Sequence, residues 1–338
     1  MAVADPLASE YEYIVVGSGA GGGTVAARLA EAGHSVLVLE AGGDPLQLAG
    51  DRLPEDYQVP AFHAFASENP AMKWDFFVRH YDDESRQLKD DKYTAERQGV
   101  LYPRAGTLGG CTAHNAMILV YPHNADWDHI AELTGDSSWR AANMRRYFER
   151  LEDCRHRPIY RWLRKLLAIN PSGHGFAGWL PVERARPPRD ALRDRAMMDV
   201  IERSAFGAIA DLEHPLKRFF WFLRAKGDPN DWRIVRRDAF GIRYVPLTTS
   251  DHARSGSRER LLDVARRYPD NLHIELDALA SRVLFDTHNR AIGVEFFKGR
   301  NLYRAHAGPA AGPGERREVH ASREVILCGG AFNTQQLL

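Results

Sequence analysis

Long apolar runs, paired cysteines and an excess of either charge are all missing from this sequence of 338 residues. No stretch approaches the roughly 18 apolar residues of a membrane-spanning helix, and the N-terminal residues lack the basic and apolar segments of a signal peptide. Lys plus Arg and Asp plus Glu number 45 each, so charge gives no argument for a nucleic-acid or anionic membrane partner. We therefore expect a cytoplasmic globular protein with room for two domains.

Cysteine is equally scarce. The three cysteines are Cys111, Cys154 and Cys328. They are too few and too scattered along the chain for a disulfide framework or a metal cluster. We interpret them as small buried thiols and predict no metal site.

The most informative segment that is present runs from Tyr13 to Gly43. A short β-branched run predicts a buried strand over 13–16, and the pattern G-x-G-x-x-G follows at 17–22. An amphipathic helix is predicted next, with Gly33 as its stop signal. A second strand over 35–40 ends in an acidic residue. Strand, glycines, helix and strand together predict a dinucleotide-binding βαβ unit.

Each residue of this unit has a mechanical role. Gly17 permits the tight turn, Gly19 lets a pyrophosphate approach the backbone, and Gly22 lets the helix pack closely on the sheet. The helix N-terminus offers N–H groups to phosphates. Glu40 can accept hydrogen bonds from a ribose diol. The pattern alone does not separate NAD from FAD. The candidate cofactor-binding residues here are Gly17, Ser18, Gly19, Ala20, Gly22 and Glu40.

A second glycine-rich loop lies within residues 101–120. Gly106, Gly109 and Gly110 would let the backbone approach a flat or charged group, and His114 follows before an apolar run. On residue statistics alone, a hydrogen-bonded core histidine is the more common role for His114.

The segment Gly106–Met117, Gly-x-x-Leu-Gly-Gly-Cys-Thr-x-His-Asn-Ala-Met, resembles the first signature of the glucose–methanol–choline (GMC) oxidoreductases, which are FAD-dependent alcohol oxidases and dehydrogenases. The stretch 40–43, Glu-Ala-Gly-Gly, is also similar to theirs. The last stretch, 323–338, resembles their second signature, with Gln335 at the usual proline position. The resemblance, closest to the choline oxidases and choline dehydrogenases, implies an α/β Rossmann-like FAD-binding domain and a partial second α+β substrate domain.

The resemblance also implies cofactor contacts. In some members a histidine at the position of His114 bonds covalently to the flavin, whereas other members lack a histidine there. The implied contacts with FAD in this chain are Gly109, Gly110, His114, Asn115, Ala116, Met117 and, through its backbone near the adenine, Ala280. An ordinary sheet residue remains the alternative for Ala280.

We expect three segments: 1–154 as the first part of the FAD-binding domain, 155–245 as a substrate or cap segment, and 246–338 as a return to the FAD-binding domain. Within the second segment, the apolar run Phe219–Leu223 is flanked by basic residues. Two uses of this run stay open: a helix over the substrate entrance, which we favour, and an interfacial membrane anchor. His174 is interpreted as a turn residue.

Further elements follow from local patterns. Loops with short helices are expected over 44–100, and one or two amphipathic helices over 129–153. The basic stretch 155–165 is interpreted as a solvated helix face rather than a nucleic-acid surface. Strands are expected at 271–274, 280–285, 290–296 and 324–328, and a last helix is expected to start at Asn333 or Thr334.

The function that the resemblance implies is oxidation of the CH–OH group of a small or apolar alcohol, with hydride transfer to flavin N5 and reoxidation by O₂ or another acceptor. Full-length relatives continue beyond the equivalent of Leu338, where the catalytic histidine lies. We therefore expect an N-terminal fragment that has no catalytic residue of its own and is inactive alone. The alternatives are an NAD(P)-dependent dehydrogenase and a non-catalytic nucleotide-binding fragment.

Overall fold

The computed structural model describes two compact units, which are treated separately here. Unit 1 comprises Met1–Ala116 and Ala253–Leu338, and unit 2 comprises Met117–His252. The described residues are 10–48, 50–185, 193–196, 198–200, 202–203, 227–237 and 243–338. The run Phe219–Leu223, for which the sequence left two uses open, lies outside them.

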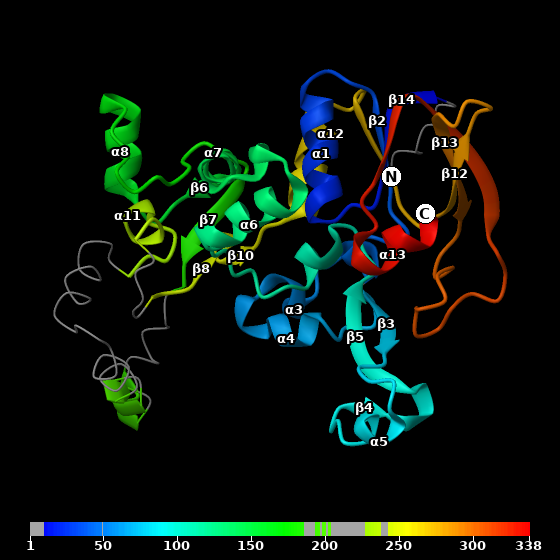
Figure 1. Cartoon of the computed structure of the whole chain (residues 1–338), viewed down its shortest axis with the longest axis horizontal. Coiled ribbons are helices and arrows are strands. Elements are labelled where there is room, and N and C mark those ends of the chain that lie inside the picture. Colours follow the sequence, from blue (N-terminus) through cyan, green and yellow to red (C-terminus); the bar gives the residue numbers. More distant parts are fainter. Residues whose placement is uncertain are drawn as a thin grey trace. The chain divides into compact units, whose positions relative to one another are not determined.

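Unit 1 is built on a six-stranded sheet with the order β11-β2-β1-β14-β13-β12. Its strands are β1 (Glu10–Val16), β2 (Val36–Leu39), β11 (Leu272–Glu275), β12 (Ala278–Phe285), β13 (Ala291–Lys298) and β14 (Glu315–Leu327). The first four in this order run parallel, and β13 and β12 complete the sheet antiparallel. In Figure 1, β14 from the end of the chain runs beside the blue N-terminal strands.

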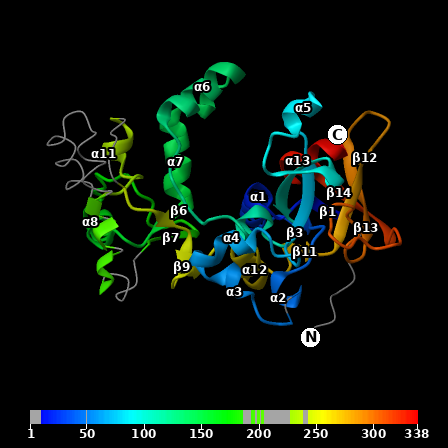
Figure 2. The same ribbon diagram turned by 90° about the horizontal axis from the view of Figure 1, so that it is seen from below.

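Apolar residues on both faces of β1 hold this sheet. Val15 packs with the helices α1 (Ala20–Glu31) and α12 (Ser257–Arg267), which cover one face together. Ile14 and Val16 face the other side, in a cluster that includes Phe296. A strand buried on both faces reads as a continuous apolar run, which is why the sequence revealed it. Figure 2 shows β12, β13 and β14 side by side at the other end of the sheet.

The predicted strands of this sheet are confirmed, with two differences at its end. β14 begins at Glu315 rather than at 324, because its first half pairs with β13. The helix α13 (Gly330–Leu337) begins before the predicted Asn333 or Thr334. Asn333 does not cap it, since its Oδ1 accepts a hydrogen bond of 2.8 Å from the Tyr303 hydroxyl.

The region 44–105 contains the expected short helices and also a small sheet. The helices are α2 (Pro45–Leu48), α3 (Glu55–Gln58), η1 (Pro60–Phe62), α4 (His63–Ala66), α5 (Glu84–Gln87) and η2 (Ala95–Arg97). The sheet has the order β3-β5-β4, formed by β3 (Lys73–Val78), β5 (Gly99–Ala105) and β4 (Tyr93–Thr94). The expectation of loops and helices alone was wrong here, because β3 finds its partner about 25 residues later, beyond the reach of local patterns.

Unit 2 has a sheet of order β6-β7-β8 flanked by helices. Its elements are α6 (Asn124–Thr134), η4 (Ser137–Trp139), α7 (Ala141–Leu151), β6 (Glu152–Cys154), α8 (Pro158–Leu167), β7 (Leu180–Arg184), α11 (Trp232–Val235), β8 (Pro246–Leu247) and β9 (Thr249–Ser250). No residue of α8 is buried, so the solvated face expected over 155–165 is confirmed from Pro158 on, whereas Arg157 is buried at 6% exposure. In unit 1, η3 (Gly110–Ala113) and β10 (Ala253–Arg254) complete the described elements.

The helices expected over 129–153 are confirmed as α6 and α7. On α7, the apolar Tyr147 is 56% exposed, whereas the charged Arg145 is buried and only 3% exposed. The Arg145 guanidinium donates to the carbonyls of Gly173 (2.6 Å) and Asn230 (2.9 Å). These buried carbonyls need a donor, and Arg145 supplies it.

Both helices lie in unit 2. The boundaries of the compact units fall at 116/117 and 252/253. The domain assignment 1–154, 155–245 and 246–338 stays a prediction. Among the helices that the structure describes, none combines the length and apolar character that a bilayer span requires.

Candidate nucleotide site

The first glycine turn is fixed between the ends of three strands. Gly17, at φ +100°, takes a backbone conformation that suits glycine, and a Cβ there would overlap the carbonyl of Cys328. Its N–H donates to the carbonyl of Leu39 (2.8 Å), and the N–H of Cys328 donates to that of Val16 (2.7 Å). α1 therefore begins at Ala20 at the carboxyl ends of β2, β1 and β14. Its N-terminus presents the positive end of the helix dipole there.

Glu40, which directly follows β2, is joined to both glycine loops. Its Oε2 accepts from the N–H (3.0 Å) and Oγ (2.5 Å) of Ser18, and its Oε1 accepts from the N–H of Gly42 (2.9 Å). The Ser18 Oγ in turn accepts from the N–H of Gly109 (2.9 Å). Burial raises the pKa of Glu40, and the hydrogen bonds from Ser18 and Gly42 oppose that rise.

The two glycine loops, some 90 residues apart in the chain, lie directly against each other. A Cβ built on Gly110, which has φ +53°, would lie 2.6 Å from the Cα of Gly19. Only a residue without a side chain at position 110 allows the backbones to approach this closely. The structure thus brings Ser18 and Gly19 together with Gly109 and Gly110.

His114 ends the short helix η3 that starts at Gly110. Its side chain is buried, with a residue exposure of 6%, and its Nδ1 has no hydrogen-bond partner among the described residues. Burial, followed by the positive charges of Arg254 and Arg104, lowers the pKa of His114 from 6.5 to about 4. The imidazole is therefore neutral near pH 7.

Three polar atoms around His114 call for a ligand. Besides the His114 Nδ1, the Nη2 of Arg254 and the Nε of Arg104 are buried without a partner among the described residues. Buried polar atoms are almost always paired, so an unpaired group of them marks a place where another molecule can bind. Two guanidinium groups and a neutral imidazole fit a polar, anionic ligand, and FAD meets this description with its phosphates and the polar edge of its ring.

The residues after His114 are held by neighbouring backbone and side chains. The Asn115 Oδ1 accepts from Arg254 Nη1 (2.8 Å). Ala116 is the last residue of this part of unit 1, and Met117 opens unit 2. Met117 is buried at φ +58°, and its carbonyl accepts from the N–H of Thr248 (2.8 Å).

Ala280 lies two residues into the edge strand that starts beside Glu40. The N–H of Ala278 donates to the carbonyl of Glu40 (2.9 Å), which fixes the start of β12 at the end of β2. Ala280 itself pairs with Phe296 and is partly buried. The structure therefore places the strand that carries Ala280 beside the predicted ribose-binding carboxylate.

Two family models match the sequence. A model of NAD(P)-binding Rossmann-like domains matches residues 15–79, and the model of GMC oxidoreductases matches residues 230–338. Residues 230–338 of this chain are therefore similar to the GMC oxidoreductases.

Individual GMC relatives match along nearly the whole chain. Ecdysone oxidase of Spodoptera littoralis is 29% identical over 332 residues, covering 98% of this chain and 45% of that protein. Mitochondrial choline dehydrogenase of Mus musculus is 30% identical over 345 residues, covering 100% and 46%. The structure of formate oxidase from Aspergillus oryzae has a TM-score of 0.67 at 19% identity, covering 99% and 48%. The fold class is thereby confirmed, and the chain spans about half the length of the curated relatives it matches.

Sequence reasoning missed the residues of α12 and β10 that support the two glycine loops. The Ser257 Oγ donates to the carbonyls of Ser18 (2.8 Å) and Gly19 (3.0 Å). Arg254 donates to the carbonyl of Thr112 (2.9 Å) as well as to Asn115. The sequence signals only a helix start here, in which Glu259 accepts from the N–H of Gly256. Nothing in it points to these long-range contacts.

Proposed function

We propose that this chain forms the FAD-binding part of a flavin-dependent oxidoreductase that acts on the CH–OH group of a small or apolar alcohol. The observation that carries the proposal is the direct contact of the two glycine loops, with His114 at the end of the second. A simple NAD(P) domain requires only the first loop. The second loop has the GMC signature, which favours FAD over NAD(P).

We assign residues to the parts of FAD in order, from the adenine through the ribose and pyrophosphate to the flavin ring. Ala280 backbone atoms would face the adenine, and Glu40, whose carboxylate is an acceptor at the end of β2, would bind the ribose. The turn through Gly17, Ser18 and Gly19, with Ala20 and Gly22 in the first helical turn, would hold the pyrophosphate. Lining the ring would be Gly109, Gly110, His114, Asn115, Ala116 and Met117.

Bound FAD would supply the hydride-accepting ring, while the chain supplies binding and electrostatics. The Glu40 carboxylate selects against a 2′-phosphate by charge repulsion, which disfavours NADP-type ligands. The remaining partners in this proposal are an alcohol and O₂ or another electron acceptor. We assign no catalytic acid or base in this chain, and we place the protein in the cytoplasm without a nucleic-acid partner.

A covalent bond between His114 and the flavin is part of this proposal. The lowered pKa keeps the imidazole unprotonated near pH 7, and only an unprotonated ring nitrogen can form such a bond. Acid precipitation of purified, FAD-loaded chain should leave the yellow colour in the pellet, and His114→Gln should release it. The matched control His288→Gln changes an exposed histidine and should retain the colour. Complete release from the unchanged chain would disprove the link.

The cofactor class is tested on the purified full chain by its absorption spectrum and by titration with FAD and with NAD⁺. We expect a flavin spectrum or saturable FAD binding, weakened more than about tenfold by Gly110→Ala. The control Gly135→Ala also has positive φ, +69°, but a Cβ there meets nothing within 4 Å. A colourless chain that binds NAD⁺ and not FAD would favour the NAD(P)-dependent alternative. FAD binding unaffected by Gly110→Ala would refute the two-loop site.

A further inference from the structure

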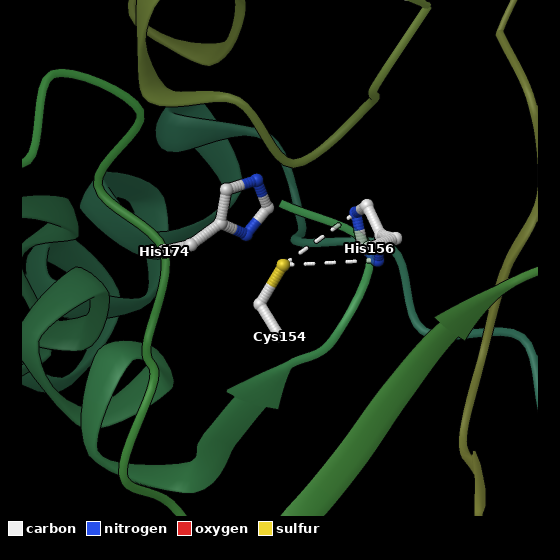
Figure 3. Close-up of side chains that lie close together, drawn as sticks. All are labelled: Cys154, His156 and His174. Carbon is white, nitrogen blue, oxygen red and sulfur yellow. Dashed lines mark hydrogen bonds between the residues drawn. The ribbon is translucent and has the colours of Figure 1, made fainter. Parts of the chain in front are cut away.

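Unit 2 contains a buried group of potential metal ligands away from the glycine loops in the sequence. Ligand atoms of Cys154, His156 and His174 all lie within 4.8 Å of one another. Figure 3 shows the sulfur of Cys154 between the two imidazole rings. Asp228 joins them, since its Oδ2 lies 3.0 Å from the Nε2 of each histidine. Cys154 and Asp228 are fully buried.

Both histidines are anchored through their other ring nitrogen. The Nδ1 of His174 lies 3.0 Å from both carboxylate oxygens of Glu152, which is itself held by the N–H of Gly175 (2.9 Å). The Nδ1 of His156 lies 3.3 Å from the carbonyl of Val182. An Nδ1–H that donates to a carboxylate or carbonyl fixes the tautomer and leaves Nε2 as a metal ligand, which is the usual arrangement around protein-bound zinc.

The separations between donor atoms suit a small tetrahedral ion. Zinc–sulfur bonds of about 2.3 Å and zinc–nitrogen bonds of about 2.05 Å at tetrahedral angles put sulfur and nitrogen about 3.6 Å apart. The Cys154 Sγ lies 3.6 Å from the His156 Nε2. It also lies 3.7 Å from the Nδ1 of that ring. A modest turn of the His156 ring about its Cβ–Cγ bond is therefore needed to aim Nε2 at the ion.

The charges around the group are also balanced by a divalent ion. Glu152 and Asp228 carry two negative charges, and Arg157, whose Nε donates to the Asp228 Oδ2 (2.9 Å), carries one positive charge. A dication bound to the Cys154 thiolate and two neutral imidazoles makes this set neutral. A metal-free set reaches the same neutrality with one imidazolium, so the alternative is a purely hydrogen-bonded network around Asp228.

We propose that Cys154 Sγ, His156 Nε2, His174 Nε2 and Asp228 Oδ2 bind a divalent transition-metal ion, Zn²⁺ by its ligand set. Four protein ligands leave no open position, so the site is structural rather than catalytic. It would join β6, the loop around His174 and the segment that precedes α11. In the metal-free network the Cys154 thiol makes long hydrogen-bond contacts with the His156 ring, at 3.6 and 3.7 Å, whereas as a thiolate it would bind the ion directly.

The test uses the full chain, stripped with a chelator and then titrated with Zn²⁺ and, separately, with Co²⁺ alone. We expect one equivalent of tightly bound Zn²⁺ by elemental analysis. With Co²⁺ we expect the intense visible bands of tetrahedral coordination and a thiolate-to-metal charge-transfer band. Zn²⁺ should also raise the melting temperature of the stripped chain.

Two cysteine variants make the test specific. Cys154→Ser should abolish the charge-transfer band, while Cys111→Ser, which changes an exposed cysteine in unit 1, should leave it intact. Circular dichroism checks that both variants are folded. A folded unchanged chain that binds no Zn²⁺ would establish the hydrogen-bonded network and overturn the proposal. So would a Co²⁺ spectrum without a thiolate band, or one equally strong in Cys154→Ser.

Discussion

His114 in unit 1 and His174 in unit 2 are both buried, yet their surroundings have opposite effects on them. His114 has two arginines nearby and an unpaired Nδ1, and its pKa falls to about 4. His174 has a carboxylate at each ring nitrogen. Burial would lower its pKa, but Glu152 and Asp228 overcome this and raise the pKa well above 6.5. Burial acts to lower the pKa of both histidines, and the charged partners decide whether the pKa stays low or rises.

The two histidines differ in their hydrogen bonds: both ring nitrogens of His174 have protein partners, whereas the Nδ1 of His114 has none among the described residues. Without a metal ion, both ring nitrogens of His174 face a carboxylate, and with the proposed ion Nε2 would bind it instead; both arrangements are structural. His114 is held neutral and incompletely paired, which suits contact with a bound molecule. The sequence already indicates different roles for the two histidines: the resemblance implies a flavin contact for His114, and His174 is interpreted as a turn residue.

The largest loss of stability is expected when His174, the histidine whose two ring nitrogens are both paired, is replaced. His174→Gln removes the partner of two buried carboxylates and should lower the free energy of unfolding by about 3–5 kcal/mol. Urea denaturation of chelator-treated chain measures it. His288→Gln, at an exposed position, should stay within about 0.5 kcal/mol of the unchanged chain. A loss below about 1 kcal/mol for His174→Gln would show that the carboxylates are stable without it.

The surroundings of His114, whose Nδ1 is unpaired among the described residues, are tested by the pH dependence of stability. The folded pKa of His114 is depressed, so its contribution to stability is present above the unfolded value of 6.5 and is lost as pH falls to about 4. A difference of about 2.5 pH units corresponds to about 3 kcal/mol. Unfolding curves between pH 7 and pH 4 should show the unchanged chain losing about this much more stability than His114→Gln. Parallel pH dependence of the two chains would contradict the assigned environment.

A smaller effect is expected where the loop that carries His114 meets the first glycine turn. Gly110→Ala places a Cβ 2.6 Å from the Cα of Gly19 and forces two backbones apart. It should cost about 1–3 kcal/mol more than Gly135→Ala, which shares the positive φ but has open space around it. Thermal unfolding of the two variants compares them directly. Equal losses would mean that backbone conformation alone, and not the close approach, selects glycine at position 110.

The smallest expected effect tests how much Arg254 contributes to the lowered pKa of His114. Arg254 is the second cause after burial, so Arg254→Gln should move the pKa of His114 only part of the way back toward 6.5. NMR titration of labelled chain follows the His114 ring directly. Arg282→Gln serves as the control, because its side chain is 60% exposed and pairs with Glu295 instead. A His114 pKa that stays the same or falls in Arg254→Gln would leave burial and Arg104 as its causes.

Local patterns predicted the parts of the fold that local chemistry determines. The run 13–16 is apolar on both faces, Gly17 has a conformation suited to glycine, and Glu40 ends the next strand, so the βαβ unit could be read directly from the sequence. The resemblance at Gly106–Met117 added the second glycine loop. The structure shows that the two loops touch at Gly19 and Gly110, a contact that neither motif alone specifies.

Long-range contacts account for what was not predicted. β3 was missed because its partner β5 lies beyond an intervening helix. Arg145 is buried because two distant backbone segments present three carbonyls to it, which the periodicity of a helix does not reveal. The sequence predicted no metal site because the cysteines lie far apart from one another. The residues around Cys154 that could bind a metal include Asp228, which is distant in the chain, so cysteine spacing could not reveal them.

The position of β14 has a consequence for biosynthesis. β1 leaves the ribosome roughly 300 residues before β14, which is its neighbour on one side in the sheet. At about 5–20 residues per second, one edge of β1 waits roughly 15–60 s for that neighbour. An unpaired strand edge is a template for pairing with other nascent chains. Slow translation or crowded polysomes should therefore burden this protein more than one whose adjacent strands are consecutive, and chaperone capture of the nascent chain should persist until β14 emerges.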